Sequence, residues 1–126
     1  MRNIVLPVIA LFLLIISCKK DEECNPGHLT NNVIGEWSVA YSSLTLGDIK
    51  FEANGTLVDV NNVLFAGGIG GGNFDEKSYI VNSDSSFTVK AVTGPTTYMF
   101  DFIVTNYTCD EIDANTSGVE VKLTRN

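Results

Sequence analysis

Short stretches in which apolar and polar residues alternate recur between residues 35 and 124, and they constrain the fold more than any other feature. The apolar positions are Trp37, Val39 and Tyr41; Ile49, Phe51 and Ala53; Phe87, Val89 and Ala91; Tyr98, Phe100, Phe102 and Val104; and Val119, Val121 and Leu123. A period of two is typical of strands with one face buried and the other in water. Turn signals such as Asn54-Gly55 and Gly94-Pro95 separate the stretches. The pattern predicts an all-β domain of about seven or eight antiparallel strands, arranged as a small up-and-down barrel or a barrel-like sandwich.

The N-terminus has the composition of a secretory signal. Arg2 precedes an apolar run over residues 4–16, which is shorter than the roughly 20 residues that a membrane-spanning helix needs. A short basic region, a short apolar region and then a small residue are typical of a signal peptide that is removed from the mature protein. We therefore expect an exported chain.

The apolar run ends in Ile15-Ile16-Ser17-Cys18, which resembles the lipobox of bacterial lipoproteins. The resemblance implies cleavage before Cys18 and attachment of a diacylglycerol to its thiol; an ordinary signal peptide cut elsewhere is the alternative. The charged residues 19–23 resemble the export signal of Bacteroidota lipoproteins, which implies a lipid anchor in the outer membrane and exposure at the cell surface. A solvated tether without an address is the alternative for this segment.

The net charge and the remaining cysteines limit what the protein is expected to bind. A net charge of −7 at pH 7 argues against nucleic-acid binding, which needs a basic surface. With Cys18 used by lipid, Cys24 and Cys109 are left, and two cysteines in an exported chain most simply form a disulfide. A metal site that combines these two thiols with His28 and Asp110 is the weaker alternative, because thiols oxidise in that compartment. No metal and no cofactor are expected.

Four short motifs, in this order along the chain, carry a family resemblance. The lipobox is followed by Gly35-Glu36-Trp37, by a hairpin over residues 49–56 with the sequence IKFEANGT, and by a last strand that ends at Arg125. Their order is similar to that of the lipocalin-like domains of Bacteroidota outer-membrane lipoproteins. The resemblance implies that Trp37 plugs one end of a barrel, that Gly35 precedes it, and that Arg125 packs over the indole ring. Another small β-sandwich is the alternative fold.

These expectations divide the chain into three parts. They are a lipoprotein signal peptide over residues 1–17, a lipidated cysteine and charged tether over 18–29, and a lipocalin-like β domain over 30–126. The membrane, reached through the lipid anchor, is one expected partner, and the sequence names no protein partner.

The sequence favours binding over catalysis. His28 is the sole histidine, and no nucleophile stands beside it in the sequence, so a Ser-His-Asp arrangement is not indicated and an enzyme is the least favoured class. A small apolar ligand in the barrel would contact some of five aromatic side chains, namely Phe51, Phe87, Tyr98, Phe100 and Phe102. An eight-stranded barrel holds one small ligand or is filled by its own side chains. In the second case the domain would be a solid interaction module that contacts a surface protein or glycan.

Overall fold

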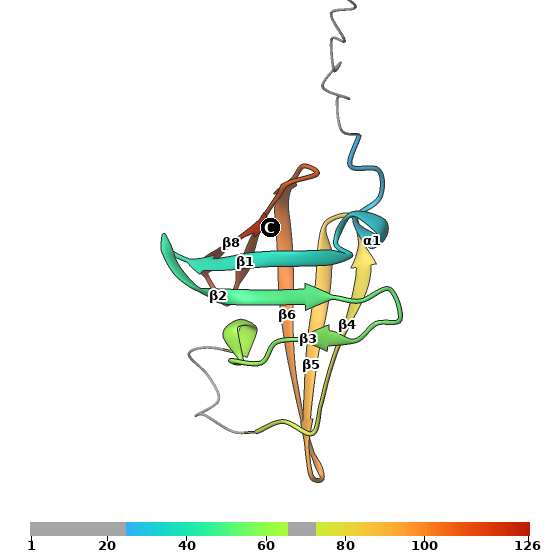
Figure 1. Cartoon of the computed structure of the whole chain (residues 1–126), viewed down its shortest axis with the longest axis vertical. Helices are drawn as coiled ribbons and strands as arrows, with labels where there is room; N and C mark the ends of the chain where they lie inside the picture. The colour runs from blue at the N-terminus through green and yellow to red at the C-terminus, as the bar shows by residue number, and fades with distance from the viewer. Residues whose placement is uncertain (1–24, 66–72) are drawn as a thin grey trace, which may run out of the picture.

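Eight antiparallel strands form one sheet that curls into a nearly closed barrel in the computed structural model, which describes residues 25–65 and 73–126 (Figure 1). The strands are β1 (Gly35–Tyr41), β2 (Leu44–Phe51), β3 (Leu57–Val58), β4 (Glu76–Ser83), β5 (Ser86–Thr93), β6 (Thr96–Tyr107), β7 (Glu111–Thr116) and β8 (Val119–Arg125). A short α-helix, α1 (Leu29–Asn32), precedes β1, and a 3-10 helix, η1 (Val63–Phe65), follows β3. The predicted all-β class and barrel-like arrangement are confirmed.

The order of strands in the sheet is β3-β2-β1-β8-β7-β6-β5-β4. Strands that follow one another in sequence pair with each other, except β3 and β4. In addition β1 pairs with β8, which sets Trp37 opposite Arg125. This pairing of the first strand with the last leaves β3 and β4 as the two ends of the sheet. Short connections of this kind are those of an up-and-down meander.

The alternating pattern separates the two faces of the sheet as predicted. On β6, Phe102 and Val104 are buried inside the barrel, whereas Met99 is 63% exposed and Ile103 is 55% exposed on the outside. The pattern fails at the ends of two stretches. Ala53 is exposed because β2 ends at Phe51, and Val119 is 41% exposed because it is the first residue of β8, beyond the packed interior.

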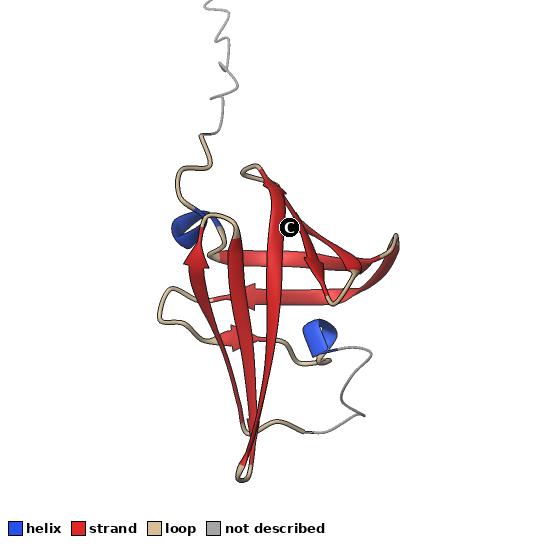
Figure 2. Cartoon of the chain, turned by 180° about the vertical axis from the view of Figure 1, so that it is seen from behind, coloured by secondary structure: helices blue, strands red, loops and turns tan. Residues whose placement is uncertain are grey.

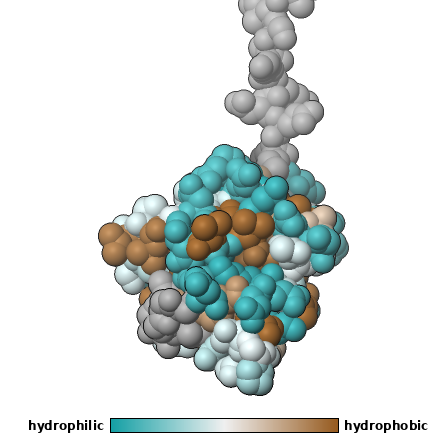
Figure 3. Space-filling view, turned by 60° about the horizontal axis from the view of Figure 1, so that its bottom comes forward, coloured by the Kyte–Doolittle hydropathy of each residue, from teal (hydrophilic) through white to brown (hydrophobic). Residues whose placement is uncertain are grey.

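The two ends of the barrel differ. Figures 1 and 2 place α1 at one end, which we call the closed end, and η1 with the β5–β6 turn far from it, at what we call the distal end. At the closed end, Leu29 and Val33 are fully buried. At the distal end, the three residues of η1 are buried. The space-filling view with the distal end turned forward shows apolar side chains that interrupt the polar surface (Figure 3).

Candidate functional site

The sheet fails to close at one place, between its end strands β3 and β4. A single bridge joins Thr56 to Ser78, and beside it the backbone N–H of Tyr79 donates to the carbonyl of Gly55 at 3.0 Å. Because β3 has just two residues, Leu57–Val58, regular pairing does not continue past this bridge. We call the opening bounded by residues 54–60 and 74–78 the seam.

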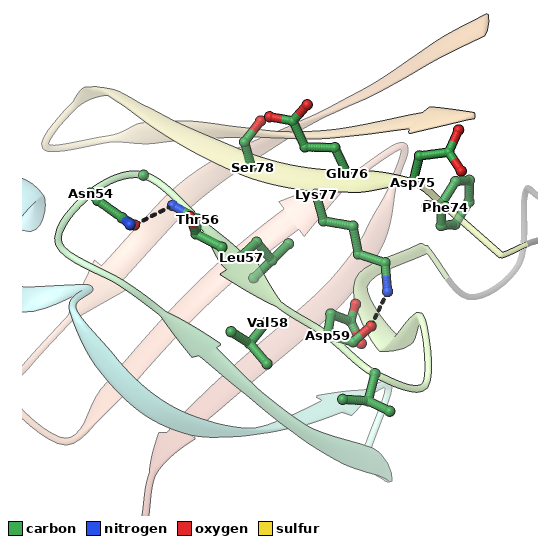
Figure 4. Close-up of a pocket in the computed structure, with 12 residues that line it drawn as sticks. Asn54, Thr56, Leu57, Val58, Asp59, Phe74, Asp75, Glu76, Lys77 and Ser78 are labelled. Carbon is green, nitrogen blue, oxygen red and sulfur yellow. Dashed lines mark hydrogen bonds between the residues drawn. The ribbon is translucent and has the colours of Figure 1, made fainter. Parts of the chain in front are cut away.

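A depression of about 460 Å³ occupies the seam (Figure 4). It is lined by Asn54, Gly55, Thr56, Leu57, Val58, Asp59, Val60, Phe74, Asp75, Glu76, Lys77 and Ser78. Apolar surface comes from Leu57, Val58 and Phe74, and charge comes from the acidic residues and Lys77. Sites for small molecules have a similar size, about 300–1,000 Å³, and combine apolar walls with a few polar groups. The seam therefore has the size and chemistry of a binding site.

Asp59 organises one wall of the depression. Its side chain is 2% exposed, and its two carboxylate oxygens accept the backbone N–H groups of Val63 at 2.6 Å and Leu64 at 2.9 Å. A carboxylate that accepts the free N–H groups at the start of a helical turn stabilises that turn. Asp59 thus holds η1 against the barrel, and η1 in turn places Phe65 at the distal end.

Lys77 lies on the opposite side of the depression and contacts Asp59. Its ammonium donates a hydrogen bond to the backbone carbonyl of Asp59 and lies 5.8 Å from the centroid of the Phe74 ring. Lys77 shares the inner face of β4 with Tyr79, which is buried. An inward-pointing charge on an end strand discourages pairing with a strand of another molecule. Lys77 therefore protects the edge of β4 and supplies a positive charge to the depression.

Tyr41, the last residue of β1, contacts η1. Its hydroxyl donates to the carbonyl of Leu64 at 3.3 Å. Burial, and to a lesser degree the negative charge of Asp59, raises the pKa of Tyr41 to about 12. Tyr41 therefore stays neutral at physiological pH and acts as a hydrogen-bond donor that fixes η1.

Two of the five predicted pocket residues lie in an aromatic cluster at the distal end. The ring of Phe65 lies 5.7 Å from that of Phe100 and 5.2 Å from that of Phe74, and Phe74 lies 6.0 Å from Tyr98 between centroids. Phe74, Tyr98 and Phe100 are half-buried. Since Phe74 also lines the depression, the cluster is continuous with the seam.

The other three predicted pocket residues fill the interior. Phe51, Phe87 and Phe102 are fully buried. The Phe87 and Phe102 rings stack with centroids 4.8 Å apart, and Phe51 meets Phe87 edge to face at 5.8 Å. Tyr79 continues the row, 4.8 Å from Phe51. Rings in mutual contact leave no space for a ligand between them, so the predicted set divides into a packed interior and a distal rim.

The three residues expected to close the barrel meet at the closed end. The guanidinium carbon of Arg125 lies 4.1 Å from the centroid of the Trp37 ring, and the indole N–H donates to the carbonyl of Val33 at 2.7 Å. Gly35 has φ of +130°, and a Cβ at this position would lie 2.7 Å from Nη1 of Arg125. Among the described residues, the side-chain hydrogen bonds of Trp37 and Arg125 go to backbone carbonyls, an arrangement compatible with the expected role in closing the barrel.

The predicted lipid-attachment residue Cys18 and the predicted disulfide partner Cys24 lie outside the described residues. Cys109 lies past the end of β6, in the turn before β7. Asn25 and Pro26, which directly follow Cys24, line the same shallow depression as Cys109. The disulfide between Cys24 and Cys109 therefore stays a prediction. The segment that directly follows Cys24 lies close to Cys109.

Asp84 and His28 form a pair that the sequence did not indicate. The Nδ1 atom of His28 lies 3.0 Å from Oδ2 of Asp84, whose other oxygen accepts the backbone N–H of Leu29 at 2.9 Å. An Asp–His pair resembles part of a catalytic triad, but within residues 25–65 and 73–126 the hydrogen bond of the His28 ring goes to Asp84 and not to a serine. The same residues contain no group of three or more His, Cys, Asp and Glu side chains placed to hold a metal.

A second depression, of about 710 Å³, lies on the outer face of β1, β8, β7 and β6. Its lining is mainly polar and includes Thr105, Asn115 and Thr124, with an ion pair between Lys122 and Asp113 at 3.6 Å. It contains no aromatic side chain. The seam depression is lined in part by the aromatic ring of Phe74, which an apolar ligand can contact, so it is the candidate site for such a ligand.

Comparison of the chain with protein family models, curated proteins and solved structures finds no match. In the described part of the chain, no helix is long and apolar enough to cross a membrane.

Proposed function

We propose that this protein is an outer-membrane lipoprotein, anchored through Cys18 and exposed at the cell surface, whose lipocalin-like domain binds a small, mainly apolar ligand without catalysing a reaction. The observation that carries the proposal is the seam, where an otherwise paired sheet leaves a depression between β3 and β4. The half-buried rings of Phe74, Tyr98 and Phe100 adjoin it. The ligand would lie at this distal rim, because phenylalanine side chains fill the interior.

The lipocalin-like assignment belongs to the same proposal. It is supported by the pairing of β1 with β8, which brings the ends of the meander together, and by the packing of Arg125 over Trp37. A disulfide between Cys24 and Cys109 is also proposed, since residues 25 and 26 lie beside Cys109. Peptide mapping without reducing agent tests it: we expect one cross-linked peptide pair, and recovery of both thiols unlinked would contradict it.

The ligand proposal is tested with the whole acylated chain in lipid nanodiscs and a long-chain alcohol that carries a photoreactive diazirine. We expect saturable labelling that mass spectrometry maps to residues 54–60 and 74–78. Phe74→Ala should weaken this labelling, because Phe74 lines the depression. Met99→Ala, which removes an exposed apolar side chain from the outer face, should leave it unchanged and is the matched control. Labelling that does not saturate, or that spreads over the outer face, would contradict the proposal.

The solid interaction module is the second candidate function. The stacked Phe87 and Phe102 rings favour it, since they show a filled interior. In that case the nanodisc experiment would give no saturable labelling by the alcohol. Chemical cross-linking in intact cells would instead join the outer face of the domain to one defined outer-membrane protein.

A further inference from the structure

Lys77 places a positive charge at the inner wall of the seam depression. It is half-buried and points from β4 toward Asp59, whereas Glu76 and Ser78 point away from that side of the strand (Figure 4). The ammonium lies 5.8 Å from the centroid of the Phe74 ring, and long basic side chains commonly lie against apolar groups in this way. The ammonium therefore stands at the boundary between apolar wall and open depression.

The contacts of this ammonium leave its charge without a carboxylate partner. Its recorded contacts are one backbone carbonyl, that of Asp59, and the face of the Phe74 ring. Among residues 25–65 and 73–126, no carboxylate oxygen lies within 4.0 Å of Nζ, the distance that defines the four ion pairs found there. An ammonium has three donors, so two N–H groups are available to a ligand.

The acidic side chains near Lys77 are occupied elsewhere. The Asp59 carboxylate accepts the N–H groups of Val63 and Leu64, and Asp75 accepts the backbone N–H of Gly94 at 2.9 Å. Glu76 is exposed on the other side of β4. The carboxylates of Asp59 and Asp75 are thus held by their own donors, and Glu76 points away from the ammonium.

We propose that the ligand is an apolar chain with a carboxylate at one end, and that the carboxylate pairs with Nζ of Lys77 while the chain lies over Leu57, Val58 and Phe74. This inference rests on the proposed function and names the class of its ligand. The ammonium can donate a hydrogen bond to an alcohol or to a carboxylate, but the carboxylate adds the attraction between opposite charges. A free carboxylate on an apolar chain therefore fits the site better than the corresponding alcohol.

The test uses the acylated chain in nanodiscs with two diazirine probes that share one long chain, a carboxylate and an alcohol. In the wild type we expect the carboxylate to half-saturate labelling of residues 54–60 and 74–78 at a concentration about tenfold below that of the alcohol, because one additional charge–charge contact of about 1.4 kcal/mol corresponds to that ratio. Lys77→Met should abolish this difference by weakening labelling by the carboxylate more than labelling by the alcohol, and far-UV circular dichroism shows that the variant is folded. Lys77→Arg should retain most of the preference. Lys50→Met, which removes an exposed lysine from β2, is the control and should change nothing.

The outcomes separate the two proposals. If neither probe labels the seam, the ligand-binding function itself is wrong. If both probes label it equally, or if Lys77→Met keeps the preference for the carboxylate, the function stands and the role of Lys77 is wrong. Displacement of the carboxylate probe by acetate at matched concentration would also overturn the inference, because it would show a simple anion site that does not use the apolar chain.

Discussion

The guanidinium of Arg125 covers the indole ring of Trp37, with 4.1 Å between the guanidinium carbon and the ring centroid. The same group donates to three backbone carbonyls, those of Cys109 at 2.6 Å, Asn32 at 2.6 Å and Ile34 at 3.1 Å. These carbonyls belong to the segment before β1 and to the β6–β7 turn. One side chain therefore ties the helix, the first strand and the last strand together at the closed end.

Arg125→Ala should lower the free energy of unfolding by about 2–4 kcal/mol, because three carbonyls lose a charged donor and the indole loses a cation above its face. Urea denaturation followed by Trp37 fluorescence measures the change. Arg125→Lys should recover only part of it, since an ammonium cannot reach three acceptors in a planar arrangement. Lys50→Ala, at an exposed position, should show no comparable loss. Equal stability of Arg125→Ala and wild type would disprove this role.

Gly35→Ala should destabilise the protein more than Gly118→Ala. Both glycines have positive φ, +130° and +81°, and a Cβ would meet the Arg125 guanidinium at 2.7 Å in the first case but no atom within 4 Å in the second. The backbone cost is about 1–2 kcal/mol at Gly118, whose φ is close to the left-handed helical region, and larger at Gly35, whose φ is one that glycine almost alone adopts. The clash is therefore the part of the cost at position 35 that disappears in the Arg125→Ala background, as a double-mutant cycle can show. A persistent excess would assign the cost to the backbone alone.

Phe87→Ala should cost about 3–5 kcal/mol of unfolding free energy, because Phe87 is fully buried between Phe51 and Phe102 and its removal leaves a cavity. Tyr98→Ala should cost clearly less, since Tyr98 is half-buried at the distal rim. Chemical denaturation of both variants provides the comparison. A small effect of Phe87→Ala would indicate that the interior is hollow and would restore Phe51, Phe87 and Phe102 as ligand contacts.

Asp84 makes the stability of α1 depend on pH. Its pKa is lowered, mainly because its carboxylate accepts the backbone N–H of Leu29 and secondarily because it pairs with His28. A group whose folded pKa is depressed contributes stability above its unfolded pKa, near 3.9 for aspartate, and loses it as the pH falls through the folded value. Wild type should therefore be more stable than Asp84→Asn at pH 6, and the difference should shrink as the pH falls through the folded pKa of Asp84. His28→Ala should have a smaller effect at pH 6, because the Leu29 hydrogen bond remains.

Urea midpoints of these three proteins at pH 6 and at low pH test this dependence. A difference between wild type and Asp84→Asn that persists at low pH would mean that the side-chain shape of Asp84, and not its charge, supports α1.

Local sequence determined which side of each strand is buried. Phe102 and Val104 face the interior and Met99 and Ile103 face water because successive side chains of a strand point to opposite faces, whatever the strand pairs with. The five alternating stretches did not include β3, β4 or β7. Residues Glu111–Thr116 of β7 carry only two apolar side chains, Ile112 and Ala114, and β6 and β8 pair with them on both sides.

The tertiary structure alone decided which inward-facing aromatic residues fill the interior and which reach the rim. Alternation assigns Phe87 and Phe100 to the same face, yet one is fully buried and the other half-buried. Their depth along the barrel depends on strand register and on irregularities such as the shift between Val104 and Asn106, which no local pattern specifies. The seam, and the position of Lys77 within it, likewise arise where two strands distant in the sheet order approach without pairing. Periodicity thus determines the face that a side chain occupies, and long-range pairing determines its neighbours.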